Sequence, residues 1–185
     1  MLRKKAPNLI SGVLSDFDLS IPVERMTNSP SSKQRTGTKP YMAIDLLQHP
    51  PPTHLYRHDL ESLFYVIVIL TSRYHEGREL TENPPLQAWF DLGADDLLDK
   101  KVSFMMNRGV PQPTLHFQKI EGMISSMRKM FRDAFAAQAD HTDNINKMTK
   151  MVAREKQAVP EFDESTLGGH INFDKFHEIL KEAIK

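Results

Sequence analysis

Two aspartates in the sequence "LSDFDLS", residues 14–20, have the clearest capacity for chemistry. Asp16 and Asp18 flank Phe17 directly after an apolar run. A carboxylate in this position can offer its oxygens to a hard cation such as magnesium. Aspartate is also a common turn residue, and these residues alone favour an ordinary turn. The choice between a metal site and a turn therefore depends on the motifs that follow.

Two further motifs follow at a defined distance. They are "TGTKPYMAID", residues 36–45, and "HDLESLF", residues 58–64. Protein kinases carry a magnesium-binding Asp-Phe-Gly, an activation segment, a Gly-Thr-x-x-Tyr-x-Ala-Pro-Glu element and a buried helix that opens Asp-x-x-Ser, in this order. The order and spacing in this chain agree with that pattern.

The agreement can be followed residue by residue. Ile44 and Asp45 stand where Pro and Glu are usual, and Asp59 and Ser62 match the opening of the buried helix. The stretches "GVLSDFDLS", "GTKPYMAIDLL" and "HDLESLFYVIVIL" resemble the fungal-type protein kinase family, which carries Asp-Phe-Asp for Asp-Phe-Gly. "LGGHINFDKFHEIL" resembles the family's C-terminal stretch. Four residues match the closing element position for position: Gly37, Thr38, Tyr41 and Ala43.

The resemblance implies a role for each matched residue. Asp16 would bind the magnesium of Mg-ATP, although Asp18 in place of glycine restricts the backbone there. Gly37, Thr38 and Tyr41 would shape the wall where a substrate hydroxyl docks.

Three further matched residues would have structural roles. Asp45 would pair with a buried arginine, for which Arg128 and Arg132 are candidates. Asp59 would brace the catalytic loop, and its carboxylate would be poorly satisfied without that loop. Ser62 would belong to the opening of the buried helix.

A polar segment lies between the first two motifs. Residues 21–45, which include "VERMTNSPSSKQRTGTKP", have little to bury, so we expect an exposed, mobile loop that the resemblance identifies as the activation segment. Its hydroxyl residues lie near basic ones, where a phosphate could pair with arginine and order the loop. Solvated, unmodified side chains are an equal alternative. The candidates are Ser29, Ser31, Ser32 and Thr36.

Several kinase motifs are missing from the 185 residues. A glycine-rich loop, an ATP-binding lysine and a His-Arg-Asp loop would all precede the Asp-Phe-Gly position. We therefore expect the C-terminal lobe of a serine/threonine kinase that is inactive alone and uses Mg-ATP only as part of a full-length parent. Its partners would be protein substrates or other proteins. The alternative is a pseudokinase or helical interaction module that binds partners without chemistry.

Composition narrows the class of protein. Lys plus Arg and Asp plus Glu both total 24, so no global field attracts nucleic acid or anionic membranes. Cysteine is absent, which excludes disulfides and thiolate metal sites. The longest apolar run, residues 63–70, is too short to span a membrane. These features predict an intracellular, cytoplasmic protein with one domain.

The expected elements are mostly helical. Residues 1–20 suggest a hairpin that turns at Pro7 and Asn8 and ends in the metal-binding loop. Asp59 is a plausible helix N-cap, with Glu61 in the first turn. Periodicity leaves helix or strand open for residues 59–72, and the resemblance predicts a helix buried on all sides.

Residues 59–185 would form a helical body. A long amphipathic helix should begin near Leu115, and a second should cover Asn144 to Lys156. A terminal helix should cover Phe173 to Ile184, with one apolar face made by Phe173, Phe176, Ile179, Leu180 and Ala183. The expected fold is mainly α, a kinase-like C-lobe with a short N-terminal hairpin.

Two further patterns suggest metal sites but fit them poorly. "ESTLGGHINFDKF" imitates an EF-hand loop, yet a lysine, Lys175, occupies the bidentate position, so we expect the start of a helix. The histidines His49, His54 and His58 follow no standard zinc spacing and are expected at the surface.

Overall fold

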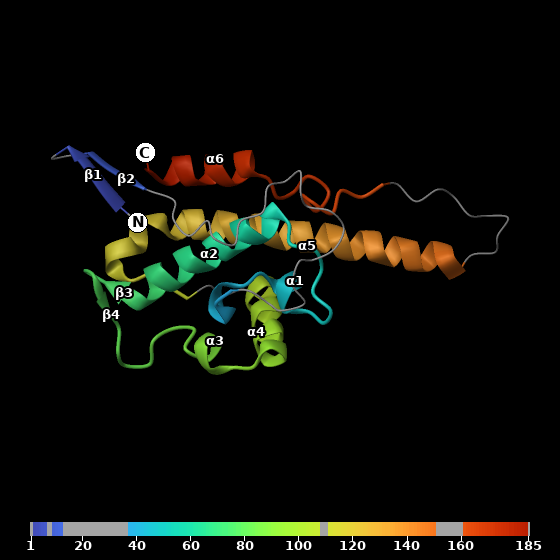
Figure 1. The fold of residues 1–185 in the computed structure, drawn as a ribbon, viewed down its shortest axis with the longest axis horizontal. Helices are drawn as coiled ribbons and strands as arrows, with labels where there is room; N and C mark the ends of the chain where they lie inside the picture. Colours follow the sequence, from blue (N-terminus) through green and yellow to red (C-terminus); the bar gives the residue numbers. More distant parts are fainter. Residues whose placement is uncertain (1, 7–8, 13–36, 108–110, 151–160, 185) are drawn as a thin grey trace. The chain divides into compact units, whose positions relative to one another are not determined.

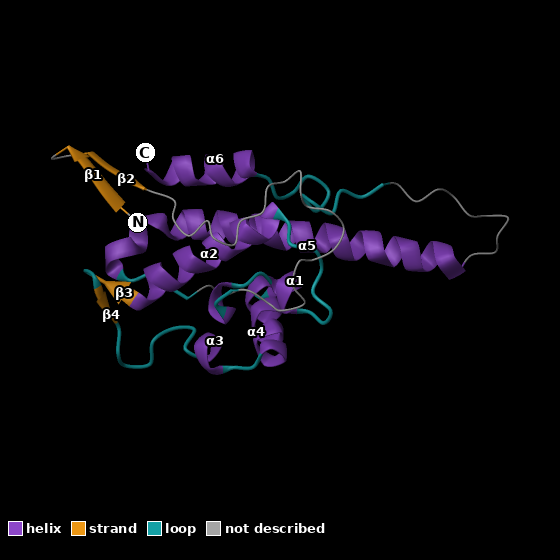
Figure 2. Cartoon of the chain, in the orientation of Figure 1, coloured by secondary structure: helices purple, strands orange, loops and turns teal. Residues whose placement is uncertain are grey.

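The computed structural model describes residues 2–6, 9–12, 37–107, 111–150 and 161–184. The chain divides into two compact units, residues 1–33 and 34–185. Helices make up most of the described chain (Figure 2), which confirms the prediction of a mainly α fold. None of the described helices is both long and apolar enough to cross a membrane.

The first unit contains the predicted hairpin. Strand β1 (Leu2–Ala6) pairs antiparallel with β2 (Leu9–Gly12), and Leu2 lies opposite Gly12. The register shifts between Lys4 and Ala6, next to the predicted turn. An isolated two-stranded hairpin is only marginally stable in water.

The second unit is helical with one very short two-stranded sheet. In chain order its elements are the 3₁₀ helix η2 (Lys39–Tyr41), α1 (Ile44–Leu47), α2 (Tyr56–Arg73), β3 (Tyr74–His75), β4 (Arg78–Glu79), α3 (Ala88–Asp91), α4 (Ala94–Met106), the 3₁₀ helix η3 (Leu115–Ile120), α5 (Glu121–Lys150) and α6 (Phe173–Ile184). Helices α2 and α6 pack against α5, and α4 packs against α1 and α5 (Figure 1).

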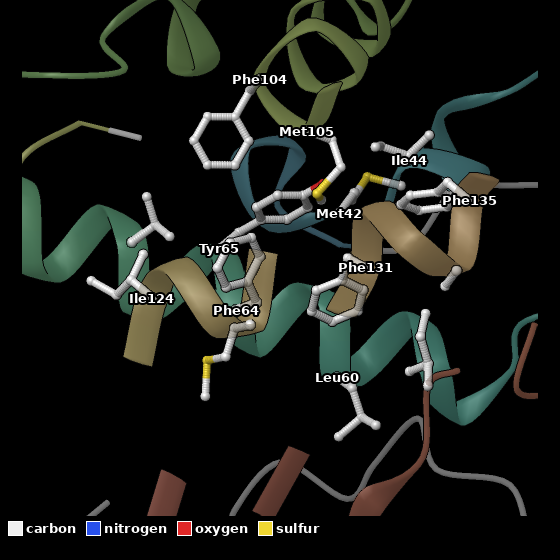
Figure 3. Close-up of a cluster of buried hydrophobic side chains, with 14 of the residues drawn as sticks. Met42, Ile44, Leu60, Phe64, Tyr65, Phe104, Met105, Ile124, Phe131 and Phe135 are labelled. Atoms are coloured by element: carbon white, nitrogen blue, oxygen red, sulfur yellow. The ribbon is translucent and has the colours of Figure 1, made fainter. Parts of the chain in front are cut away.

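An aromatic cluster forms the centre of this unit. The rings of Phe64 and Phe131 lie 5.4 Å apart, and Phe64 lies 6.2 Å from Phe104. Figure 3 shows these rings together with Tyr65, gathered between α2, α4 and α5. Burial of large aromatic rings contributes strongly to core stability. The cluster therefore fixes α2 relative to the two helices around it.

Helix α2 covers the predicted helix but is open on one face. The run Val66 to Ile69 is β-branched, and packing against α5 keeps it helical despite its strand propensity. Leu63 and Leu70 are 43% and 46% exposed. The expectation of a helix buried on all sides is therefore wrong for this face.

The C-terminal helices follow the prediction with two corrections. Helix α5 runs without a break to Lys150, so no second helix begins at Asn144 within the described residues. Residues 151–156 of that predicted helix lie outside them. Helix α6 has the predicted bounds, but Phe173 is 61% exposed and does not share its buried face.

The packing of Phe64 can be tested by substitution. We expect Phe64→Ala to lower the free energy of unfolding by about 3–5 kcal/mol, because it removes a fully buried ring from the aromatic cluster. Urea denaturation followed by circular dichroism measures the change. The matched control is Leu63→Ala, the exposed neighbour on the same helix, which should cost less than about 1 kcal/mol. Equal losses would contradict the described orientation of α2.

Candidate functional site

The described site residues fall on one segment and on the helix beneath it. Residues 37–47, called the anchored segment below, contain Gly37, Thr38, Tyr41 and Asp45. Helix α2 carries Asp59 and Ser62. The other predicted site residues lie outside the described residues, and their roles stay predictions: Asp16, Ser29, Ser31, Ser32 and Thr36.

The start of the anchored segment is accessible. Gly37 and Thr38 are exposed. Gly37 has a φ of 135°, a backbone conformation that residues other than glycine rarely adopt. Thr38 precedes η2, and its carbonyl accepts a hydrogen bond from the Tyr41 amide at 2.9 Å. Tyr41 is half-buried, with its ring edge-on to Phe90 at 6.4 Å. Gly37 and Thr38 thus remain accessible to a partner, while residues 42–45 are buried.

A buried ion pair holds the end of the segment. Arg57 Nη2 lies 2.7 Å from Asp45 Oδ2, and both side chains are almost fully buried. Arg57 Nε also donates a hydrogen bond to the Glu164 carbonyl at 2.8 Å. One guanidinium therefore joins α1 and α2 to the loop before α6.

Arg57 is the partner of Asp45 that the sequence left undecided. Neither predicted candidate pairs with Asp45: Arg128 donates to the Asn107 carbonyl, and Arg132 lies 3.8 Å from Asp133. The missed signal was local, since Arg57 lies only twelve positions after Asp45 in the sequence.

His58 completes this cluster in its neutral form. Its Nδ1 accepts the Leu55 amide at 3.0 Å, and its Nε2 lies 3.6 Å from Asp45 Oδ2, beyond a good hydrogen bond. Burial lowers the pKa of His58, although Asp45 acts in the opposite direction. Burial would raise the pKa of Asp45, but interactions with His58 and Arg57 outweigh it and lower that pKa. The stabilisation from Asp45 is thus present above pH 3.8, its ordinary pKa, and is lost as the pH falls further.

Glu61 holds the middle of the segment from α2. Its Oε1 accepts hydrogen bonds from the Ile44 amide at 2.9 Å and from the Tyr65 hydroxyl at 2.6 Å. Burial raises the pKa of Glu61 to about 7, against the effect of these hydrogen bonds. Glu61 was expected in the first turn of the helix, but α2 begins at Tyr56, so Glu61 lies in the second turn.

Lys101 on α4 holds the adjacent carbonyl. Its Nζ is fully buried and donates a hydrogen bond to the Met42 carbonyl. It also lies 3.8 Å from the centre of the Tyr65 ring and 5.0 Å from that of Trp89, within range of cation–π attraction. Burial lowers the pKa of Lys101 to about 7, although Glu61 acts in the opposite direction. Sequence analysis missed Lys101 because a lysine in a helix normally indicates a surface position.

Asp59 has a different environment from the one expected. Helix α2 begins at Tyr56, so Asp59 is inside the first turn and is not the N-cap. Its carboxylate is exposed and lies 2.9 Å from His54 Nε2. It is therefore satisfied by a surface histidine. Ser62 is half-buried on the same helix.

The two patterns that suggested metals have other roles. Asn172 Oδ1 accepts the Lys175 amide at 2.9 Å at the start of α6, which confirms the prediction of a helix start. Of the three histidines, His58 is buried, which corrects its expected surface position. Within the described ranges, no three acidic or histidine side chains are placed to bind a metal ion together.

Comparison with known protein families connects this geometry to a class of protein. Residues 1–71 match the family model described as fungal protein kinase. The match supports an assignment of this part of the chain to the fungal-type protein kinase family. The fungal-kinase match includes Asp16, the anchored segment and α2 as far as Thr71, and it supports a kinase-related function. Lys101 lies beyond it. Searches of curated proteins and of solved structures gave no significant match.

The buried ion pair can be tested by a double-mutant cycle. Arg57→Met leaves the Asp45 carboxylate buried without its cation, so the free energy of unfolding at pH 7 should fall by about 3–5 kcal/mol. The combined variant Asp45→Asn with Arg57→Met should lose less than the sum of the single variants, because neither charge is left unpaired. Urea denaturation of the four proteins measures the coupling. Additive losses would contradict the pairing.

Proposed function

We propose that the chain forms the C-terminal lobe of a fungal-type serine/threonine protein kinase. Its full-length parent transfers the γ-phosphoryl group of ATP to a protein hydroxyl. The observation that carries this proposal is the family match over residues 1–71, which includes both the Asp16 motif and the anchored segment. The 185 residues are proposed to be inactive alone, because they contain no glycine-rich loop, ATP-binding lysine or His-Arg-Asp motif.

The geometry of the anchored segment supports a docking role. Phosphoryl transfer depends on holding the acceptor hydroxyl in position, so the docking surface has to be rigid. Side chains from α2 and α4 hold residues 42–45 by buried contacts, while Gly37 and Thr38 remain exposed next to them. In this proposal, the exposed start of the segment contacts the protein substrate.

Asp16 is the residue proposed to hold the magnesium of Mg-ATP. A carboxylate oxygen is the type of ligand that magnesium prefers, and the residue lies within the family match. Bound magnesium neutralises charge that develops on the transferred phosphoryl group. The chain's own contribution is then one ligand and a fixed docking segment.

A second candidate function is partner binding without chemistry. It is favoured by the apolar residues exposed on α2, where Leu63 and Leu70 are each more than 40% exposed. Exposed apolar surface is typical of interaction sites when it is contiguous. A pseudokinase or interaction module would use this face and would not need Asp16.

The native protein distinguishes the two functions. We would isolate it from its source with an antibody to residues 161–184, determine its intact mass and assay phosphoryl transfer from Mg-ATP to a general protein substrate. For the kinase, Asp16→Asn should reduce kcat/KM by about 100-fold or more, because it removes a metal ligand.

The matched control is Asp99→Asn, the same substitution at an exposed position on α4, which should leave kcat/KM unchanged. Native protein that transfers no phosphate would favour the interaction module. Full activity of Asp16→Asn would contradict the assigned metal ligand.

A further inference from the structure

Two buried ionisable side chains hold neighbouring backbone groups of the anchored segment. Lys101 donates to the carbonyl of Met42, and Glu61 accepts the amide of Ile44. The residue between them, Ala43, is fully buried. The two side chains come from different helices, α4 and α2, so together they fix the segment from both sides.

The Tyr65 side chain connects Glu61 and Lys101. Its hydroxyl donates to Glu61 Oε1 at 2.6 Å, and the face of its ring lies 3.8 Å from Lys101 Nζ. Both ionisable groups are removed from water, since Glu61 is 1% and Lys101 0% exposed. Buried charges are costly, and their protonation states adjust to reduce that cost.

We propose that Glu61 and Lys101 form a clamp whose hold on the anchored segment depends on pH, loosest near neutrality and tighter in mild acid. The two are positioning residues. Through Met42 and Ile44 they would set the position of the exposed residues Gly37 and Thr38. Only the effect of that position on substrate docking rests on the proposed function.

The direction of the pH effect follows from proton linkage. Burial raises the pKa of Glu61 from 4.5 to about 7, so between these values the closed clamp holds a proton that the open one has released. Closing is therefore favoured as the pH falls from 7 towards 4.5. Burial lowers the pKa of Lys101 from 10.5 to about 7, so the closed clamp lacks a proton in that range and is favoured as the pH rises. The clamp therefore holds the segment most weakly near pH 7, where the Glu61 and Lys101 ranges meet.

The other groups that face the clamp cannot produce this pattern. The pKa of Asp45 is lowered below 3.8, so it stays ionised, and burial raises the pKa of Tyr65 well above 10, so it stays neutral. His58 has a lowered pKa, which would loosen the structure in acid and thus has the opposite sign. Arg57 pairs with Asp45.

Hydrogen exchange at the Ile44 amide, measured by NMR between pH 5 and pH 8, tests the clamp. After correction for intrinsic exchange, the opening equilibrium constant should rise by up to about tenfold for each pH unit from pH 5 towards pH 7, since opening releases one proton. It should level off near pH 7 and fall above it. The measurement needs no phosphoryl transfer, so its failure would leave the proposed function untouched.

Glu61→Gln is the matched variant. The amide oxygen can still accept from Ile44 and Tyr65, but it does not titrate, so the rise below pH 7 should disappear. Lys101→Met should abolish the fall of the opening constant above pH 7 and keep its rise between pH 5 and pH 7. An opening constant that does not vary with pH, or that varies equally in Glu61→Gln, would overturn the proposal. Each variant removes the pH dependence on one side of pH 7. If one variant does not fold, the other variant still tests the proposal.

Discussion

The arrangement of the second unit depends on the buried charges that meet residues 42–45. Glu61, Lys101 and the Asp45–Arg57 pair are all removed from water, and each satisfies a backbone group or an opposite charge of the anchored segment or of the loop before α6. An unpaired buried charge costs several kcal/mol, so displacing the segment would expose or orphan these groups together. The segment therefore has one place on α2, even though η2 and α1 are each only a single turn.

Helix α2 carries residues of both the aromatic cluster and the contacts that hold the anchored segment. Phe64 lies in the core, and Glu61, one turn earlier, binds the segment. Tyr65 contacts both Glu61 and Lys101. The core fixes the helix, and the fixed helix positions the anchors. A rigid docking segment is thus a consequence of core packing. That is the physical link between the fold and the proposed kinase function.

The sequence predicted the elements that have strong local signals. The hairpin, α2 and α6 follow from turn residues, motif order and apolar spacing. The spacing hid α4, because the buried Lys101 interrupts an apolar face made by Leu97, Phe104 and Met105. Motif comparison placed Asp45 against a buried arginine, but the two candidates it offered, Arg128 and Arg132, have other partners. Glu61 and Arg57 belong to residue types that usually face solvent, so only the tertiary contacts reveal that they are buried.

The most direct measurement for this account is the NMR spectrum of the Lys101 side chain, assigned in the folded chain. If α4 holds the segment as described, the terminal methylene protons of Lys101 should be shifted upfield by the rings of Tyr65 and Trp89 and show nuclear Overhauser contacts to both. Trp89 is the single tryptophan of the sequence, so the contact is unambiguous. Methylene shifts like those of a solvated lysine, without contacts to either ring, would show that α4 does not clamp the segment and would contradict the account.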